Sequence, residues 1–189
     1  MLLSKYRQVV LTFLTLTFLS TNIWAEPKAD RIQWSHLIPE GFEPETLLKD
    51  YEDDIKRLNE MPDNSEEGLA LLQKLQAIIA NSPINEKLDG QTVSIAGFIA
   101  PLTVKNAAID QFLLVPYFGA CIHVPAPPIN QTILVNTAPG QGIKLHMADF
   151  PYLVTGKLTL QQTSTDIGTA GYHLIDAKVE QYKDDIWLE

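Results

Sequence analysis

The chain has 189 residues, enough for one domain with a sizeable core, and carries 23 acidic against 14 basic side chains, a formal net charge of −9 at pH 7. This acidic excess argues against nucleic acid and anionic membrane surfaces as partners, because both are bound through basic surfaces. The single cysteine, Cys121, excludes a disulfide within the chain.

Residues 1–25 are predicted to be a secretory signal peptide, cleaved near Ala25. Lys5 and Arg7 precede an apolar run at 9–19, and Ala25 supplies the small residue that cleavage requires. A signal anchor is the alternative, although the run is short for a transmembrane span. No stable membrane insertion is expected after cleavage. The predicted location is the periplasm, where the mature chain of residues 26–189 would have a net charge of −11, because the removed segment holds two basic and no acidic residues.

Residues 26–43 are predicted to form an extended leader on the domain surface, and residues 44–87 a two-helix arm. Apolar residues recur at helical spacing in two runs, separated by a break at 61–64, and Ser65 is a suitable N-cap for the second helix. The predicted buried faces are Leu47, Leu48, Tyr51, Ile55 and Leu58 in the first helix and Leu69, Leu72, Leu75, Gln76 and Ile79 in the second. The acidic residues between positions 50 and 54 indicate a solvated face, with cation binding as the less favoured alternative.

Residues 88–189 are predicted to form a β domain of five strands, near 93–99, 112–115, 131–135, 152–161 and 172–182. Gly97 and Gly156 fall inside strands, where glycine is typical of bulges and of the bends by which small barrels turn corners. Pro101 is expected to end the first strand. The fold class is therefore mainly β with an N-terminal helical pair (α+β), and the predicted architecture is a small antiparallel five-stranded OB-like barrel. A β-sandwich is the alternative.

The segment 112–131 holds the candidate site. An apolar strand leads to Cys121, His123 follows two residues later, and a proline-rich loop comes next. On an extended segment, residues i and i+2 point to one side, so a thiolate and an imidazole there could bind one zinc or copper ion. His146 and His173 are the candidates for further ligands, but their distance in sequence makes the motif weak.

Three other interpretations of this segment stay open. Cys121 and His123 could be structural, as a buried thiol and a histidine bonded to backbone. Cys121 could be the nucleophile of a thiol-dependent enzyme, although no second cysteine and no obvious base within hydrogen-bonding reach supports that chemistry. The loop could instead present a stiff apolar surface to a ligand or partner protein. The candidate binding residues are Tyr117, Phe118, Pro125, Pro127, Pro128, Asn130 and Gln131.

The sequence also resembles a family of exported proteobacterial proteins, domain of unknown function 3299, over about residues 88–182. The resemblance lies in Leu-Asp-Gly at 88–90, Ile-Ala-Gly-Phe-Ile-Ala-Pro-Leu at 95–102, Gly-Ala-Cys-Ile-His at 119–123 and Pro-Pro-Ile-Asn-Gln at 127–131. Ala126 and Ile129 stand where a longer proline run is expected. The resemblance implies an OB-like barrel, a periplasmic or lipoprotein-like setting and a genetic association with transporters, some linked to metal supply. It implies no activity.

Taken together, these patterns favour binding over catalysis. The expected function is that of a periplasmic binding or accessory protein, assisting an envelope transport system through Cys121 and His123. The expected partner is another envelope protein, such as a component of a transporter, and zinc or copper is the candidate cofactor.

Overall fold

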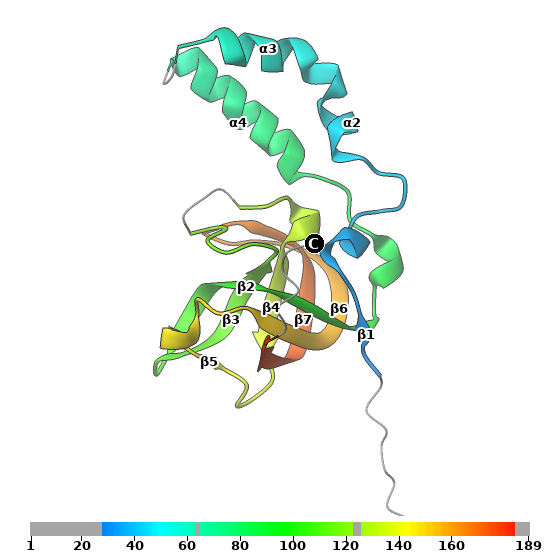
Figure 1. Cartoon of the computed structure of the whole chain (residues 1–189), viewed down its shortest axis with the longest axis vertical. Helices are drawn as coiled ribbons and strands as arrows, with labels where there is room; N and C mark the ends of the chain where they lie inside the picture. Colours follow the sequence, from blue (N-terminus) through cyan, green and yellow to red (C-terminus); the bar gives the residue numbers. More distant parts are fainter. Residues whose placement is uncertain (1–27, 63–64, 123–125, 184–189) are drawn as a thin grey trace, which may run out of the picture.

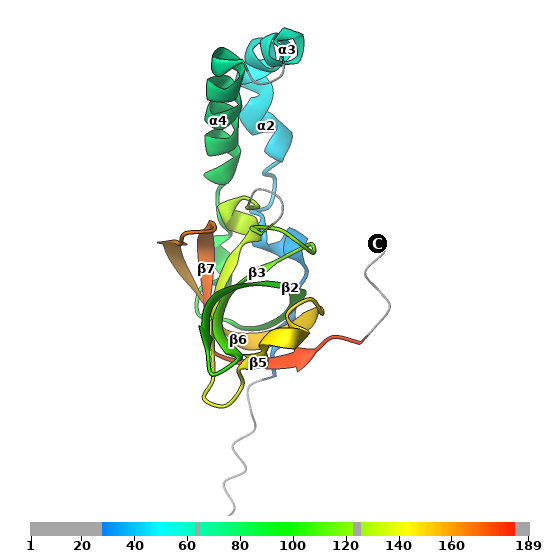
Figure 2. The same cartoon turned by 90° about the vertical axis from the view of Figure 1, so that its left-hand side faces the viewer.

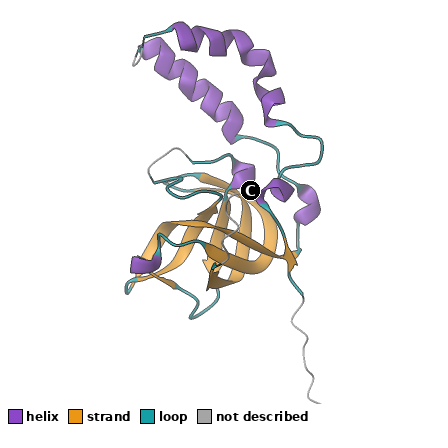
Figure 3. Cartoon of the chain, viewed as in Figure 1, coloured by secondary structure: helices purple, strands orange, loops and turns teal. Residues whose placement is uncertain are grey.

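A computed structural model describes residues 28–62, 65–122 and 126–183. It shows a β-barrel with a helical arm standing off one end (Figures 1 and 3). The proposed signal peptide and its cleavage site lie outside the described residues. Among the helices within them, none is long and apolar enough to cross a membrane.

Five strands close into a ring in which β2 pairs with β3, β3 with β4, β4 with β7, β7 with β6, and β6 with β2. Their bounds are β2 Thr92–Lys105, β3 Ala108–Val115, β4 Ile133–Thr137, β6 Tyr152–Ser164 and β7 Thr169–Gln181. This ring confirms the predicted OB-like barrel. The prediction of an antiparallel barrel was wrong for one of the five pairs, because β4 and β7 run parallel. The other four pairs are antiparallel, so the barrel is mixed. Two short strands, β1 (Asp30–Arg31) and β5 (Ile143–Lys144), pair with ring members from outside the ring.

The two glycines predicted inside strands have different roles in the barrel. Gly156 lies where the β6–β7 register shifts between Thr155 and Lys157. A Cβ added at Gly97 would lie 2.8 Å from the carbonyl oxygen of Val115, so only glycine permits this approach of β2 to β3. The expectation that Pro101 ends its strand was wrong. β2 continues to Lys105, and a register shift after Pro101 accommodates the residue that cannot donate a ladder hydrogen bond.

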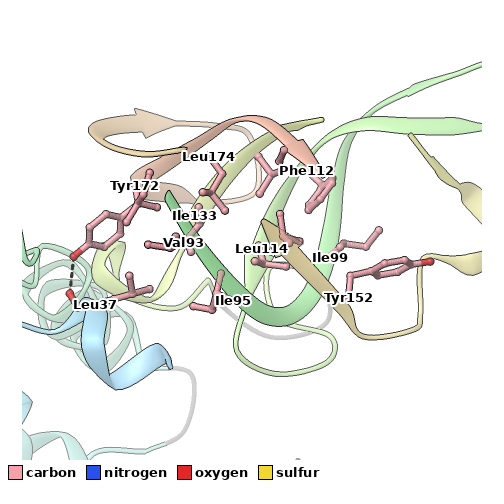
Figure 4. Close-up of a cluster of buried hydrophobic side chains, with 14 of the residues drawn as sticks. Leu37, Val93, Ile95, Ile99, Phe112, Leu114, Ile133, Tyr152, Tyr172 and Leu174 are labelled. Atoms are coloured by element: carbon pink, nitrogen blue, oxygen red, sulfur yellow. Dashed lines mark hydrogen bonds between the residues drawn. The ribbon is translucent and has the colours of Figure 1, made fainter. Parts of the chain in front are cut away.

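The barrel interior is filled by alternate side chains of the five strands (Figure 4). Phe112 and Leu114 of β3 meet Ile133 and Val135 of β4 there. The core also includes Leu37, Val93, Ile95, Ile99, Tyr152, Val154, Leu158, Tyr172 and Leu174. Leu37 belongs to η1 (Trp34–Leu37) in the predicted leader, which therefore closes one end of the barrel. Burial of this apolar set is the main stabilising contribution to the barrel.

The arm consists of α2 (Pro44–Leu48), the 3-10 turn η2 (Lys49–Tyr51), α3 (Glu52–Glu60) and α4 (Glu66–Ala80). The Ser65 hydroxyl accepts a hydrogen bond from the Gly68 N–H at 3.1 Å, as expected for the N-cap of α4. The predicted buried face of α4 was wrong in part. Gly68 and Leu71 are buried with Leu75, whereas Leu69 and Leu72 are exposed.

This difference has a physical reason. α4 is apolar on most of its circumference, so hydrophobic spacing fits more than one face. The α2–α3 segment packs where Gly68 leaves room, because a Cβ added at Gly68 would lie within 4 Å of both Leu58 and Met61. Close packing at the glycine therefore selects the face that contains it.

The junction between arm and barrel is a set of hydrogen bonds. The Tyr172 hydroxyl donates to the Leu37 carbonyl at 2.6 Å and accepts from the Asn85 N–H at 2.6 Å. The buried Asn130, in η4 (Ile129–Gln131), donates from Nδ2 to the Pro83 carbonyl at 2.9 Å. These bonds fix the segment after α4 to the end of the barrel.

Candidate functional site

A second apolar cluster lies on the outside of the barrel. Successive side chains of a strand point to opposite faces, so Leu113 and Val115 of β3 face away from the core that Phe112 and Leu114 fill. We call this set the outer cluster; its buried members are Ala100, Leu113, Val115, Ala120, Leu134 and Ala170. Phe98, Leu102, Cys121 and Ile167 pack against it and are partly buried. An apolar outer face on a barrel strand requires a cover.

The cover comes from residues 116–122 and 126–128, on the connection from β3 to η4. It folds back through a tight turn in which the Ile122 N–H donates to the Gly119 carbonyl at 3.2 Å. Cys121 occupies the third position of this turn with a φ of 66°, and Gly119 has a φ of 82°. A turn with positive φ at its third position ordinarily takes glycine or asparagine there. Cys121 therefore has a strained backbone conformation, and this conformation places its side chain against the outer cluster.

The turn between β6 and β7 closes over the same place. A Cβ added at Gly168 would lie 2.8 Å from the Ala126 Cβ and 3.5 Å from the Cys121 sulfur, so this turn packs directly on the loop. The Thr165 hydroxyl accepts from the Gly168 N–H at 3.2 Å and holds the turn closed. Burial raises the pKa of the Cys121 thiol to about 11. The thiol is consequently neutral at physiological pH in this environment.

Above the outer cluster, the loop exposes large apolar side chains. Tyr117, Phe118 and Ile122 are 46%, 56% and 54% exposed. We call these three residues the loop patch. Phe118 also makes an edge-to-face contact with Phe98 of β2, with ring centroids 5.8 Å apart and planes at 72°. The patch therefore rests on the barrel wall.

The candidate metal ligands are not brought into one group among the described residues. His123 lies outside them. His146 is exposed in η5 (Leu145–Met147), while His173 of β7 is half-buried with both ring nitrogens engaged, Nε2 2.6 Å from Asn136 Oδ1 and Nδ1 3.2 Å from Gln161 Oε1. Burial lowers the pKa of His173. Across residues 28–62, 65–122 and 126–183, no group of three or more His, Cys, Asp or Glu side chains is placed to hold a metal ion.

The remaining candidate binding residues divide between the patch and the junction. Tyr117 and Phe118 belong to the exposed loop patch, and Pro125 lies outside the described residues. Pro127 is buried and Pro128 half-buried, and both carbonyls accept from the Thr132 hydroxyl, at 3.3 and 3.1 Å.

Asn130 and Gln131 use their side-chain amides inside the protein. Asn130 donates to the Pro83 carbonyl, and Gln131 Nε2 donates to the Trp34 carbonyl at 3.0 Å. Both amides thereby hold the leader and the end of the arm at the barrel.

Sequence reasoning missed Ile122 and Phe98 as parts of this surface. Ile122 lies beside Cys121, and an exposed isoleucine in a turn next to two aromatic residues is a detectable signal. Phe98 has no such signal, because its contact with Phe118 depends on the fold-back of the loop.

The family model described as "Protein of unknown function (DUF3299)" matches residues 34–181. The crystal structure of a DUF3299 family protein from Pseudomonas aeruginosa PAO1 is similar at a TM-score of 0.61 and 32% sequence identity, covering 84% of this chain and 99% of that chain. None of the curated proteins compared with the chain matches it. The match extends beyond the barrel into the leader and the arm.

Proposed function

Because this chain belongs to the DUF3299 family of proteins of unknown function, we propose a function from its own geometry: it is an exported binding module that holds a partner protein of the cell envelope on the loop patch. The observation that carries the proposal is the exposure of Tyr117, Phe118 and Ile122 within one short loop. A group of exposed apolar side chains on a soluble domain is typical of an interaction site.

The support beneath the patch favours binding. Ala120 and Cys121 anchor the loop in the outer cluster, and Phe118 rests on Phe98. A surface that is already ordered loses little conformational freedom when a partner binds, so more of the contact free energy appears as affinity. In this proposal Cys121 packs against the outer cluster and helps to hold the loop in place.

Two features of the sequence set the partner class. Residues 1–25 have the basic and apolar segments of a secretory signal peptide, and export would bring the chain to the cell envelope. The acidic balance of the chain disfavours nucleic acid, and an apolar patch bearing a tyrosine suits a protein surface. The proposed partner is therefore an envelope protein, such as a component of a transporter.

The test is site-specific crosslinking in cells that produce the full chain. A photoreactive residue replaces Phe118 or Ile122, and the matched control replaces Phe150, an equally apolar residue that is 44% exposed in another part of the chain. We expect one discrete adduct in the envelope fraction from positions 118 and 122 and none from 150. Adducts of equal yield from all three positions, or none from the loop, would overturn the proposal.

A parallel measurement addresses the metal alternative. Native mass spectrometry of the purified chain with added zinc or copper(I) would be compared with Cys121→Ser. A one-to-one complex that is lost in the variant would replace the packing role of Cys121 with a ligand role. We expect no complex that depends on Cys121.

A further inference from the structure

Helix α4 has an unusual distribution of charge. Among its 15 residues, Glu66 and Glu67 in the first turn and Lys74 are the only charged ones. A surface helix normally has one apolar and one charged face, and a helix that is apolar on most of its circumference is normally covered on both sides. We therefore expect α4 to pack against other elements on two of its faces.

One face already has its partner. Gly68, Leu71 and Leu75 are buried against the α2–α3 segment. Two of the three charged residues of α4 pair with the same segment: Lys74 Nζ is 2.8 Å from Asp54 Oδ2, and Glu67 pairs with Arg57 at 2.5 Å. These pairs join α3 to α4 and leave Glu66, in the first turn, as the one charged residue of α4 outside them.

The remaining face carries a second line of residues at helical spacing, three of them apolar. Leu69, Leu72, Gln76 and Ile79 follow one another at intervals of three, four and three residues, the spacing of a helix-packing seam. We call these four residues the outer seam. Leu69 and Leu72 are 48% and 40% exposed, which is high for leucines in mid-helix.

The barrel does not cover the outer seam. Figures 1 and 2 show from two directions that the arm rises away from the end of the barrel, joined to it through the segment after α4. The hydrogen bonds from Asn130 to Pro83 and between Asn85 and Tyr172 fix that segment. They fix the segment after α4 to the end of the barrel, and α4 rises away from that point.

Charge indicates what would cover the seam. Residues 43–80 hold ten acidic and four basic residues, a net charge of −6. Two of the four basic residues, Arg57 and Lys74, are already paired within the arm. A second copy of this arm would bring the same sign of charge to the contact, whereas a basic segment would be attracted to it.

We propose that the outer seam of α4 docks an amphipathic helix of a partner protein, with lysine or arginine residues flanking its apolar stripe. The docked helix would complete a three-helix bundle with α4 and the α2–α3 segment. Apolar anchors at helical spacing supply the affinity in such contacts, and the flanking charges supply the attraction and the orientation. This inference goes beyond the loop patch and does not depend on it.

The test uses two synthetic 18-residue helical peptides with the same Leu/Ala stripe, one flanked by lysines and one by glutamates. Their binding to the purified chain is measured by fluorescence anisotropy. We expect the lysine peptide to bind, its affinity to fall with added salt, and the glutamate peptide not to bind. The Leu69→Ser/Leu72→Ser double variant should bind the lysine peptide about tenfold more weakly. Because both leucines are substantially exposed, this variant should fold, which circular dichroism checks.

Controls separate this proposal from the proposed function. Phe118→Ser removes a residue of the loop patch and Leu145→Ser an exposed leucine elsewhere, and both should leave peptide affinity unchanged. Equal binding of the two peptides, or unchanged binding by the seam variant, would overturn the proposal. So would a dimer of the wild-type chain in sedimentation that the seam variant abolishes, because a second copy would then be the occupant.

Discussion

The hydroxyl of Tyr172 donates a 2.6 Å hydrogen bond to the carbonyl of Leu37, across 135 residues of sequence (Figure 4). The same oxygen accepts from the Asn85 N–H, so one buried side chain ties together the leader, the end of the arm and strand β7. Burial raises the pKa of this phenol to about 12, which keeps its proton available for the Leu37 bond at any physiological pH.

Tyr172→Phe is therefore expected to destabilise the chain by about 1–3 kcal/mol, because it leaves the Leu37 carbonyl and the Asn85 N–H without their partner. Urea unfolding followed by tryptophan fluorescence measures the change. The control is Tyr117→Phe, which removes an exposed hydroxyl and should change the free energy of unfolding by less than about 0.5 kcal/mol. Equal effects of the two substitutions would show that the buried bond contributes nothing.

Gly171→Ala tests the close approach of β7 to η4. A Cβ at this position would lie 2.6 Å from the carbonyl oxygen of Ile129 and 2.8 Å from Ile84 Cγ2. The backbone must shift to relieve such contacts, so we expect a loss of about 1–3 kcal/mol in the free energy of unfolding. Gly156→Ala is the matched variant, because a Cβ there would lie no closer than 3.2 Å to its nearest neighbour, the carbonyl oxygen of Ile175. Its free energy of unfolding should fall by less. A reversed order in thermal denaturation would contradict the packing at Gly171.

The thiol of Cys121 should react slowly. Its pKa of about 11, against an ordinary 9.0, lowers the thiolate fraction on the order of a hundredfold near neutral pH. Alkylation by iodoacetamide at pH 7.5, followed by mass spectrometry, should therefore be much slower in the folded chain than in urea. The rate should rise with pH beyond pH 9. Alkylation as fast in the folded chain as in urea would contradict the buried thiol and favour a thiol-dependent activity.

The histidine of β7 predicts a pH dependence of stability. Burial lowers the pKa of His173 below its ordinary value of 6.5, so the unfolded chain takes up a proton more readily than the folded one as pH falls. The stabilising contribution of the neutral imidazole is present above pH 6.5 and is lost as pH falls below it. We expect the free energy of unfolding, measured in urea, to fall less between pH 7.5 and pH 5 in His173→Gln than in the wild type. His146→Gln, which changes an exposed histidine, should follow the wild type.

Much of the fold could be predicted from the sequence because the barrel has strong local signals. Alternating apolar residues marked the strands, and Gly156 marked a real register shift in β6. The sequence did not predict that β4 and β7 pair in parallel, because strand direction in a closed ring depends on the route of the connections. The buried face of α4 was also beyond local reasoning, because leucines on two faces offered the same periodicity.

The exposed loop patch falls within the segment 112–131 that the sequence singled out, while the function of that segment stays a prediction. Tyr117 and Phe118 were predicted as binding residues and lie exposed. Asn130 looked equally available in the sequence, yet its amide is buried in the junction with Pro83. An amide next to a proline-rich loop gives no local sign of whether it faces a ligand or a carbonyl of the same protein. The orientation of the Asn130 amide depends on Pro83, whose carbonyl lies 47 residues earlier in the chain.

The slender junction between arm and barrel has a consequence for cooperativity. Leu71 and Leu75, the buried leucines of α4, belong to neither apolar cluster of the barrel, whose core is closed by Leu37 and Tyr172. Two regions with separate buried apolar sets can open separately, so amide protons of α3 and α4 should exchange with solvent without any opening of the barrel strands. A covering helix on the outer seam would then slow exchange in the arm alone, leaving the barrel as an unaffected internal reference.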